Sequence, residues 1–351
     1  MTATEIQSLV QSLSKEEKAE LIETHISWII LTSEFAYKFK KPMRYSFLNY
    51  SKPMKRKFYC QQELELNSRY SNIYLDVVIV YRNGDSVQLA KGDEVIDFGV
   101  KMLRMNPEFQ MDRMIEKDLV TTKHVAKLAR KIAGFHQKAE VVKTPFCPRE
   151  ASFKFEDIRT VKSFLYRELG LKADRQINEA ILESKHFINS HVHLFENRIK
   201  YGFVRDLHGD LHSKNIFLYK DPIVFDCIEF NDDFRQIDVL NEIAFTCMDL
   251  EAFGREDLNA QFIATYLEAF PVMSSHEEEQ LFSYYKCYRA NVRAKVNALR
   301  AKQASNEKEK HRLLEEVTKY LNLMTAYKDQ FGGSYSLEAI DFGNGNNHSY
   351  I

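Results

Sequence analysis

The sequence lacks the features that mark membrane-spanning, secreted and nucleic-acid-coating proteins. Its 351 residues contain no apolar run approaching the ~18 residues that a membrane-spanning helix needs. The opening residues lack the basic and apolar regions of a secretory signal. Lysine and arginine total 49 against 50 for aspartate and glutamate, so no basic excess indicates nucleic acid or an anionic membrane as a partner. These absences predict a cytoplasmic protein that binds neither membranes nor nucleic acids.

Cysteine is scarce and shows no pairing pattern. The chain has five cysteines, an odd number, which are widely spaced and form no Cys-x-x-Cys pair. This spacing argues against a disulfide framework and a zinc knuckle, and it suits a reducing compartment. Hydrophobic residues make up 44% of the chain and charged residues 28%, which is ordinary globular usage and excludes wholesale disorder.

The length predicts two domains or two lobes, since a domain typically has ~100–200 residues. In the first third, aromatic residues alternate with small or basic residues over 35–40, which is the period of a strand. Asn83-Gly84-Asp85 is a strong hairpin signal. We expect a small, mostly antiparallel lobe over 1–104, with helices within 4–23 and at 53–70, and strands at 74–82, 86–90 and 95–105.

The remaining two-thirds has mainly helical periodicity. Val125, Leu128 and Ile132 recur at three- and four-residue steps, and Thr121 or Thr122 is placed to cap their helix. Short strands within 199–230 interrupt this pattern. We expect a helical lobe over 105–330 and a loosely held tail at 331–351. The predicted helices lie at 121–139, 156–169, 173–195, 238–252, 256–269, 276–302 and 307–329.

One segment, 201–231, carries polar residues that a hydrophobic core would exclude. Asp210 and Asn215 lie five residues apart in one loop, and Asp226 directly follows a strand-like run. Brought together by a hairpin, these side chains suit phosphoryl transfer. One carboxylate accepts a hydroxyl proton, while the amide oxygen and the other carboxylate hold Mg²⁺ on nucleotide phosphates. The competing interpretation is turn chemistry, because Asp and Asn favour turns.

The run HGDLHSKN followed by FD resembles the catalytic and metal-binding loops of the aminoglycoside phosphotransferase and choline-kinase-like branch of the protein-kinase-like fold. The wider pattern THISW, AYKFKKP, HGDLHSKNIF and VFDCIEFND is similar to a bacterial subgroup of that branch, over residues 24–300. The resemblance implies a two-lobed α+β fold, with ATP (GTP not excluded) and Mg²⁺ as cofactors. It implies Asp210 as catalytic base and Asn215 and Asp226 as metal ligands, within loops at 205–231.

A kinase-like mechanism also needs a lysine on the nucleotide phosphates and an acid that orients it. The Ala-x-Lys spacing favours Lys38 over Lys40, since the strand must end near Pro42. An exposed strand charge is the competing interpretation for any single lysine. Glu63 on the following helix is the expected partner, with Glu65 as the alternative because sequence does not fix the helix phase.

The chain departs from the family pattern in its phosphate loop. A glycine-rich loop should precede Lys38, yet the first glycine is Gly84. The turn at 24–27 or the turn at 32–34 is therefore expected to cover the phosphates. The last strand of the lobe is expected to offer backbone groups to the base, through Lys101, Met102 and Leu103.

His208 and His212 permit a rival interpretation, a metallophosphoesterase with His and Asp on metal ions. That class resembles a chain with separate motifs on successive strands, whereas residues 206–210 here form one continuous run. We expect instead that a neutral His208 bonds the loop backbone. Asp238 and Glu242 match a stretch that braces the catalytic loop in the family, where Asp is more usual at 242. Helix capping is the alternative role for Asp238.

The sequence suggests two acceptor surfaces. The basic stripe of the helix at 276–302 includes Arg289 and Arg293 and suits an anionic acceptor, while a solvated face paired with acidic helices is the competing interpretation. An aminoglycoside would need an acidic pocket, for which the chain offers Asp232, Asp233, Asp249 and Glu251.

These observations predict a phosphotransferase that moves the γ-phosphate of ATP to a hydroxyl of a small molecule. The alternative is a nucleotide-binding regulator with little transfer activity. The missing glycine loop favours this alternative, and the complete set of Asp210, Asn215 and Asp226 disfavours it.

Overall fold

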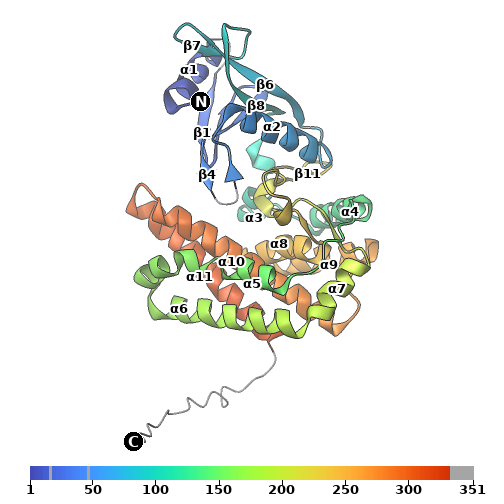
Figure 1. Ribbon diagram of the computed structural model, residues 1–351. Coiled ribbons are helices and arrows are strands. Elements are labelled where there is room, and N and C mark those ends of the chain that lie inside the picture. The colour runs from blue at the N-terminus through green and yellow to red at the C-terminus, as the bar shows by residue number, and fades with distance from the viewer. Residues whose placement is uncertain (16–17, 46–47, 333–351) are drawn as a thin grey trace, which may run out of the picture. The chain divides into compact units, whose positions relative to one another are not determined.

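The computed structural model describes residues 1–15, 18–45 and 48–332 (Figure 1). The chain forms two compact units, each built from two separate stretches of sequence. The first contains residues 1–146 and 193–275, and the second contains 147–192 together with 276 onward. Apart from Arg289 and Arg293, every residue predicted above to take part in phosphoryl transfer lies in the first unit.

The first unit begins with a six-stranded antiparallel sheet in the order β1-β2-β3-β8-β6-β7. The predicted turn at Gly84, whose φ is 55°, connects β6 to β7. The predicted lysine strand, β3, lies between β2 and β8 and pairs with both of them. The strands are β1 (Glu20–Glu23), β2 (Ser27–Leu31), β3 (Phe35–Lys40), β6 (Tyr74–Asn83), β7 (Ser86–Gln88) and β8 (Glu94–Leu103), with β4 (Arg44–Tyr45) and β5 (Leu48–Asn49) as a separate pair.

One face of this sheet is apolar and is covered by the N-terminal helix. In α1 (Ala3–Leu13), the apolar residues Ile6 and Leu9 are buried and belong to the same core cluster as Trp28 and Phe39. Burying each such side chain contributes roughly 1.5–3 kcal/mol, so this face anchors the strands that carry the lysines.

The opposite face of the sheet carries the lysines. There α2 (Pro53–Ser68) contributes Cys60 to a core cluster that also contains Ala36. Because side chains alternate across a strand, Lys38 and Lys40 share this face with Ala36. The alternation read from the sequence therefore places both lysines beneath α2.

The N-terminal stretch differs from the prediction, which expected helices throughout 4–23. Among the residues described in that stretch (4–15 and 18–23), α1 is the helix that forms. It is capped by Thr2, whose Oγ1 accepts from the Glu5 amide at 3.2 Å while the Glu5 carboxylate accepts from the Thr2 amide at 2.7 Å. Residues 20–23 form β1 instead and pair along β2. Hydrogen bonding to a neighbouring strand outweighs a weak local preference for helix.

The rest of the first unit consists of helices and short strand pairs that hold the loops of the candidate site. α8 is buried over nearly its whole length. The helices are α3 (Met111–Glu116), α4 (Thr122–Lys138), α7 (Val192–Lys200), α8 (Val239–Ala252) and α9 (Glu256–Ala269). β9 (Val204–Asp206) pairs with β12 (Gln236–Asp238), and β10 (Ile216–Phe217) pairs with β11 (Ile223–Val224).

The second unit is helical. Its longest helix, α6, has a left-handed residue at Gly170 (φ 76°), which divides it where the sequence predicted a break between two helices. Its helices are α5 (Pro148–Glu156), α6 (Arg159–Ser190), α10 (His276–Lys302) and α11 (Glu307–Phe331).

The structure does not test the predicted lobe boundary or most of the predicted C-terminal tail. β8 ends at Leu103, and the lobe boundary at 104 stays a prediction. The expected loose tail at 331–351 lies outside the described residues from 333 onward.

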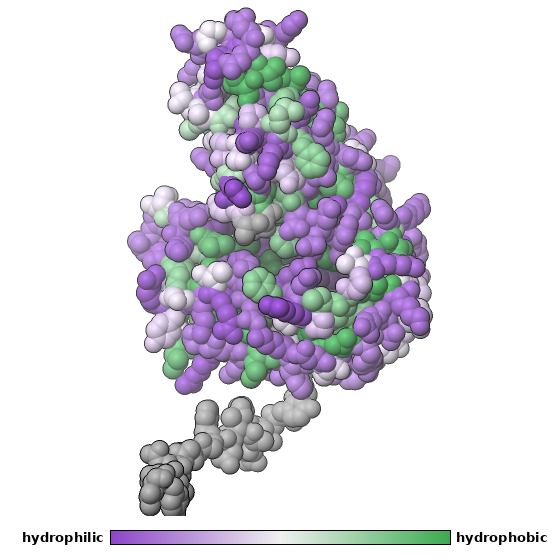
Figure 2. Space-filling view, viewed as in Figure 1, coloured by the Kyte–Doolittle hydropathy of each residue, from purple (hydrophilic) through white to green (hydrophobic). Residues whose placement is uncertain are grey.

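No described helix combines the length and the apolar character needed to cross a bilayer. Hydrophilic residues cover most of the face seen in Figure 2.

Candidate functional site

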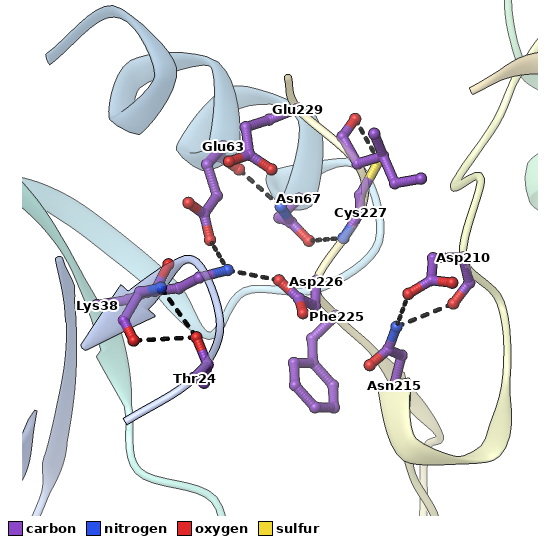
Figure 3. Close-up of polar contacts among 12 residues, drawn as sticks. Thr24, Lys38, Glu63, Asn67, Asp210, Asn215, Phe225, Asp226, Cys227 and Glu229 are labelled. Carbon is purple, nitrogen blue, oxygen red and sulfur yellow. Dashed lines mark hydrogen bonds and ion pairs between the residues drawn. The ribbon is translucent and has the colours of Figure 1, made fainter. Parts of the chain in front are cut away.

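A small hairpin brings the two loops of the site together. β10 pairs with β11, and the Phe225 amide then donates to the Asn215 carbonyl at 3.1 Å. Two residues after Asp226, the Ile228 amide donates to the His208 carbonyl at 3.1 Å. The loop that carries Asp210 and the loop that carries Asp226 therefore lie side by side, as Figure 3 shows.

Asp210 and Asn215 are in direct contact. The Asn215 amide nitrogen Nδ2 donates to the Asp210 carbonyl at 2.9 Å and to its carboxylate Oδ2 at 3.0 Å. His212 Nε2 lies 3.3 Å from the same carboxylate oxygen. The side chain of Asp210 is 37% exposed, so a solute can reach it. Because Nδ2 is committed to Asp210, Asn215 keeps its oxygen Oδ1 for a cation.

Asp226 is held in an uncommon backbone conformation. Its φ is 64°, in the left-handed region that non-glycine residues rarely adopt, at a cost of about 1–3 kcal/mol. The Asp226 amide donates to the hydroxyl of Tyr74 at 2.9 Å, which helps to sustain this conformation. The carboxylate is 43% exposed. Strained residues of this kind cluster at functional sites, which makes Asp226 a candidate site residue on backbone grounds as well.

Lys38 contacts both carboxylates that surround it. Its Nζ lies 2.6 Å from Asp226 Oδ1 and 2.8 Å from Glu63 Oε1, whereas Glu65 is exposed (Figure 3). Burial alone would lower the pKa of Lys38, but the charges of Asp226 and Glu63 raise it well above its usual value. Burial would likewise raise the pKa of Glu63, yet Lys38 and Lys40 lower it. Lysine and glutamate are therefore both charged at neutral pH.

Lys40, the lysine that the sequence ranked below Lys38, lies in the same cluster of charges. The strand ends at Lys40 itself, so this side chain still points to the face of Lys38. Its Nζ lies 2.5 Å from Glu63 Oε2, contacts Glu229 Oε1, and is 1% exposed. The two-residue spacing from Lys38 was the available signal, because such residues share a face of a strand.

Both ring nitrogens of His208 are engaged with the loop backbone. Nε2 lies 2.9 Å from the Phe225 carbonyl, and Nδ1 accepts from the Asp210 amide at 3.3 Å. Burial lowers the pKa of His208 to about 4, so the ring is neutral at pH 7. A histidine bonded in this way has no nitrogen left for a metal, which removes a central ligand from the metallophosphoesterase interpretation. Among described residues, no three His, Cys, Asp or Glu side chains gather as a metal cluster.

Acid should destabilise the fold through two buried neutral histidines. Burial lowers the pKa of His208 to about 4 and that of His136 to about 3, against about 6.5 in an unfolded chain. The stability that they contribute is complete above pH 6.5 and is lost as the pH falls toward 4 and then 3. We expect urea titrations to show a free energy of unfolding about 4 kcal/mol lower at pH 5 than at pH 7.5.

A matched variant separates this effect from general acid sensitivity. His136 Nδ1 lies 2.7 Å from the hydroxyl of Tyr266, and His136→Gln keeps a polar partner there without a titrating ring. The variant should lose about half of the pH dependence between 7.5 and 5. An unchanged dependence contradicts the assignment of His136 as a buried neutral group.

Glu242 holds the catalytic loop through two backbone amides, and Asp238 lies at the start of the same helix. The Glu242 carboxylate accepts from the amides of His208 at 2.7 Å and Gly209 at 3.0 Å, so this glutamate reaches the loop where the family more often has aspartate. Asp238 forms two 2.8 Å contacts with the buried guanidinium of Arg198 and also caps α8 through the Leu240 amide. The capping role of Asp238 is confirmed, and its role as a brace of the catalytic loop stays a prediction.

Asn67 is another residue that sequence reasoning missed. Its Oδ1 accepts from the Cys227 amide at 2.9 Å, and its Nδ2 donates to the Glu63 carbonyl at 2.9 Å (Figure 3). It therefore ties α2 to the loop of Asp226. The signal was its position one helical turn after Glu63, on the same face of α2.

The predicted base-binding residues are largely committed to the sheet. The backbone of 101–103 lies in β8, between β3 and β6. The Leu103 amide donates to the Ile73 carbonyl at 2.8 Å, and the Arg104 amide donates to the Glu34 carbonyl at 2.7 Å. These two donors are occupied because β8 is a central strand, with β3 on one side and β6 on the other. The contact of Lys101, Met102 and Leu103 with the base stays a prediction.

The structure distinguishes the two turns expected to cover the phosphates. The turn at 24–27 joins β1 to β2, and Thr24 Oγ1 accepts from the Ser27 amide at 2.9 Å. Ser27 pairs with Lys40, so this turn lies at the lysine end of β3. The turn at 32–34 joins β2 to β3 at the opposite end of that strand. Only the turn at 24–27 is therefore near the lysines.

The basic stripe on α10 belongs to the second unit. Arg289 is buried, with its guanidinium 5.7 Å from the ring centre of Tyr288, and Arg293 lies 5.5 Å from that of Tyr320. The solvated-face interpretation is therefore wrong for Arg289. The role of both arginines toward an acceptor stays a prediction.

Two aspartates of the acidic pocket expected in the first unit differ in their exposure to solvent. Asp232 is exposed and pairs with Arg235 at 2.8 Å. Asp249 is buried and accepts from the Ser213 amide at 2.9 Å, so it holds the catalytic loop and does not line a pocket. Of this pair, only Asp232 has a carboxylate placed to meet a solute.

No family model matches the chain. Proteins described as uncharacterized in Mycobacterium tuberculosis and Mycobacterium bovis are 29% identical to it over 302 residues. The match covers 84% of this chain and 58% of those relatives, so the chain spans less than two thirds of their length.

Solved structures share the architecture at low sequence identity. A choline kinase from Cryptosporidium parvum is 10% identical with a TM-score of 0.51, over 90% of this chain and 91% of that chain. An ethanolamine kinase from Plasmodium vivax is 13% identical with a TM-score of 0.50, over 90% of this chain and 84% of that chain. These likenesses confirm the predicted α+β, protein-kinase-like fold.

Proposed function

We propose that this chain is an ATP- and Mg²⁺-dependent phosphotransferase that acts on a hydroxyl group of a small molecule. The observation that carries the proposal is the grouping, within one compact unit, of Lys38 with Glu63 and Asp226 and of Asp210 with Asn215. A buried lysine on an ion-paired glutamate, next to an exposed carboxylate and an amide, is the set that phosphoryl transfer needs.

The donor atoms suit magnesium. Asn215 Oδ1 and the partly exposed carboxylate of Asp226 are hard oxygen ligands, which Mg²⁺ prefers, and two protein ligands leave room for nucleotide phosphates and water. A bound Mg²⁺ offsets negative charge on the phosphates. The strained backbone of Asp226 and its bond to Tyr74 fix the direction of that carboxylate in advance.

The protein groups divide the remaining tasks. Asp210 accepts the proton of the acceptor hydroxyl, since its carboxylate is reachable and is oriented by Asn215. Lys38 exchanges its contact with Asp226 for phosphate oxygens and keeps its charge because Glu63 stays beside it. Backbone and hydroxyl groups of the 24–27 turn cover the phosphates in place of a glycine-rich loop. Positioning and electrostatics account for most of the catalysis in such reactions.

A small-molecule acceptor agrees with the solved neighbours, which are named as choline and ethanolamine kinases. Asp232 is an exposed acid of the first unit that suits a cationic or polyhydroxylated acceptor. A screen of phosphate transfer from labelled ATP onto metabolite extracts would identify the acceptor class. ATP binding without transfer to any metabolite would favour the regulator.

Lys38→Met should weaken Mg·ATP binding at least tenfold, because a charge-assisted contact to phosphate contributes about 1.5–3 kcal/mol. Isothermal titration calorimetry measures this without knowledge of the acceptor. The control is Lys91→Met, which removes an exposed lysine between β7 and β8. Equal affinities in wild type and Lys38→Met would contradict the role of Lys38, and a wild type without nucleotide affinity would contradict the proposed function itself.

A further inference from the structure

Beside the pair of Lys38 and Glu63 lies a second, more deeply buried lysine bridge. We infer that Lys40 and Glu229 form a positioning pair, which keeps Glu63 and the loop of Asp226 in place while Lys38 is engaged on phosphate. The inference rests on the proposed function and assigns it two further residues, neither of which touches the reacting atoms.

Glu63 is shared between the two lysines through separate oxygens. Oε1 lies 2.8 Å from Lys38 Nζ, and Oε2 lies 2.5 Å from Lys40 Nζ. The Glu63 side chain is 0% exposed, so water cannot replace a lost partner. When Lys38 binds a phosphate, the Glu63 carboxylate still has an ion-pair partner, because Lys40 stays in contact with it. An unpaired buried carboxylate would otherwise oppose that movement.

Glu229 extends the bridge to the metal-binding loop. It lies three residues after Asp226, and its Oε1 accepts from both Lys40 and the hydroxyl of Tyr50, the latter at 2.6 Å. The Tyr50 side chain is itself fully buried, and Lys40 Nζ lies 5.0 Å from the centre of its ring. Glu229 is thus fixed from two directions. Through Lys40, β3 is joined both to Glu63 on α2 and to the loop that carries Asp226.

The two lysines differ in how readily each can exchange its ion-pair partners. Lys38 contacts Asp226, whose side chain is 43% exposed, so this ion pair opens readily to solvent and ligands. Both partners of Lys40 are buried, with side-chain exposures of 0% and 5%. Burial and charge therefore mark Lys38 as the lysine that exchanges partners and Lys40 as the one that does not.

The first test compares the thermal stability of Lys38→Met and Lys40→Met. Lys38→Met leaves Glu63 paired with Lys40, whereas Lys40→Met leaves Glu229 without its lysine and Glu63 with one fewer. Breaking a buried pair is strongly destabilising, so we expect Tm to fall by about 10 °C for Lys40→Met and by only about 3 °C for Lys38→Met. The reverse order would overturn the inference.

The second test separates positioning from fold stability. The double variant Lys40→Met with Glu229→Gln restores the native charge balance of the cluster, and the oxygen of the introduced amide can still accept from Tyr50. We expect its Tm to return to within about 3 °C of wild type. The Mg²⁺ concentration that gives half-maximal ADP affinity should nonetheless stay raised at least tenfold, as for other residues that orient metal ligands. Recovery of both quantities would overturn the positioning role.

These outcomes can be told apart from failure of the proposed function. If wild-type protein binds no ADP at any Mg²⁺ concentration, the phosphotransferase proposal fails, while the order of the two Tm values still tests which lysine anchors Glu63. If wild type binds Mg·ADP and the double variant does so at the same Mg²⁺ concentration, the phosphotransferase stands and the positioning pair does not.

Discussion

Asp210→Asn is expected to lower turnover about 10³-fold while nucleotide affinity stays within about twofold. The substitution keeps the size of the side chain and a partner for Asn215, whose Nδ2 lies 3.0 Å from the carboxylate oxygen Oδ2. It removes the group that accepts the hydroxyl proton. The contacts proposed for the nucleotide involve Lys38, Asn215 and Asp226, which the change leaves in place.

The measurement is steady-state transfer from ATP to an acceptor found by the metabolite screen, with calorimetric ADP binding alongside. Asp85→Asn is the matched control, since it neutralises an exposed aspartate of the same unit in the turn between β6 and β7. It should leave the rate of the chemical step unchanged. A parallel loss of turnover and nucleotide affinity in Asp210→Asn would show that Asp210 acts in nucleotide binding and not as the base.

Glu242→Gln should reduce the free energy of unfolding by about 3 kcal/mol and turnover at least tenfold. The native carboxylate uses one oxygen for the His208 amide and the other for the Gly209 amide. A glutamine offers one oxygen and one NH₂ group, so one buried backbone donor would face another donor. The loop cannot easily rearrange around it, because Gly209 has a φ of 85° and lies against the Phe234 carbonyl.

Urea unfolding and transfer kinetics measure the two effects. Glu256→Gln on α9 is a suitable control, as it removes a surface carboxylate in the first turn of a helix and should cost less than about 1 kcal/mol. A stable Glu242→Gln protein with normal turnover would mean that the catalytic loop keeps its shape without this brace.

The sequence predicted the strands and most helices correctly wherever local pattern and tertiary packing agree. The alternation at 35–40 and the turn at Gly84 each report directly on a sheet whose faces are both covered. It failed at 20–23, where four residues with helical preference gain more from pairing with β2. That gain depends on the neighbouring strand and not on the four residues themselves, so propensity does not reveal it.

For the candidate site, spacing was enough to predict that Asp210, Asn215 and Asp226 lie near one another, because one short hairpin connects them. Spacing was not enough for Lys40, Glu229 and Asn67. Their contacts join segments up to 189 residues apart, and each residue type is more common on a surface.

Glu63 and Asn67 stand one turn apart on α2, and this spacing makes the helix a common support for both halves of the chemistry. A displacement of α2 along its axis would withdraw the acid from the lysines and, through Asn67, pull on the chain at Cys227 in the same movement. Nucleotide binding and metal coordination would then be gained or lost together. Any ligand or protein that shifts this one helix would thereby act as an on–off control, with no need to reach the reacting groups.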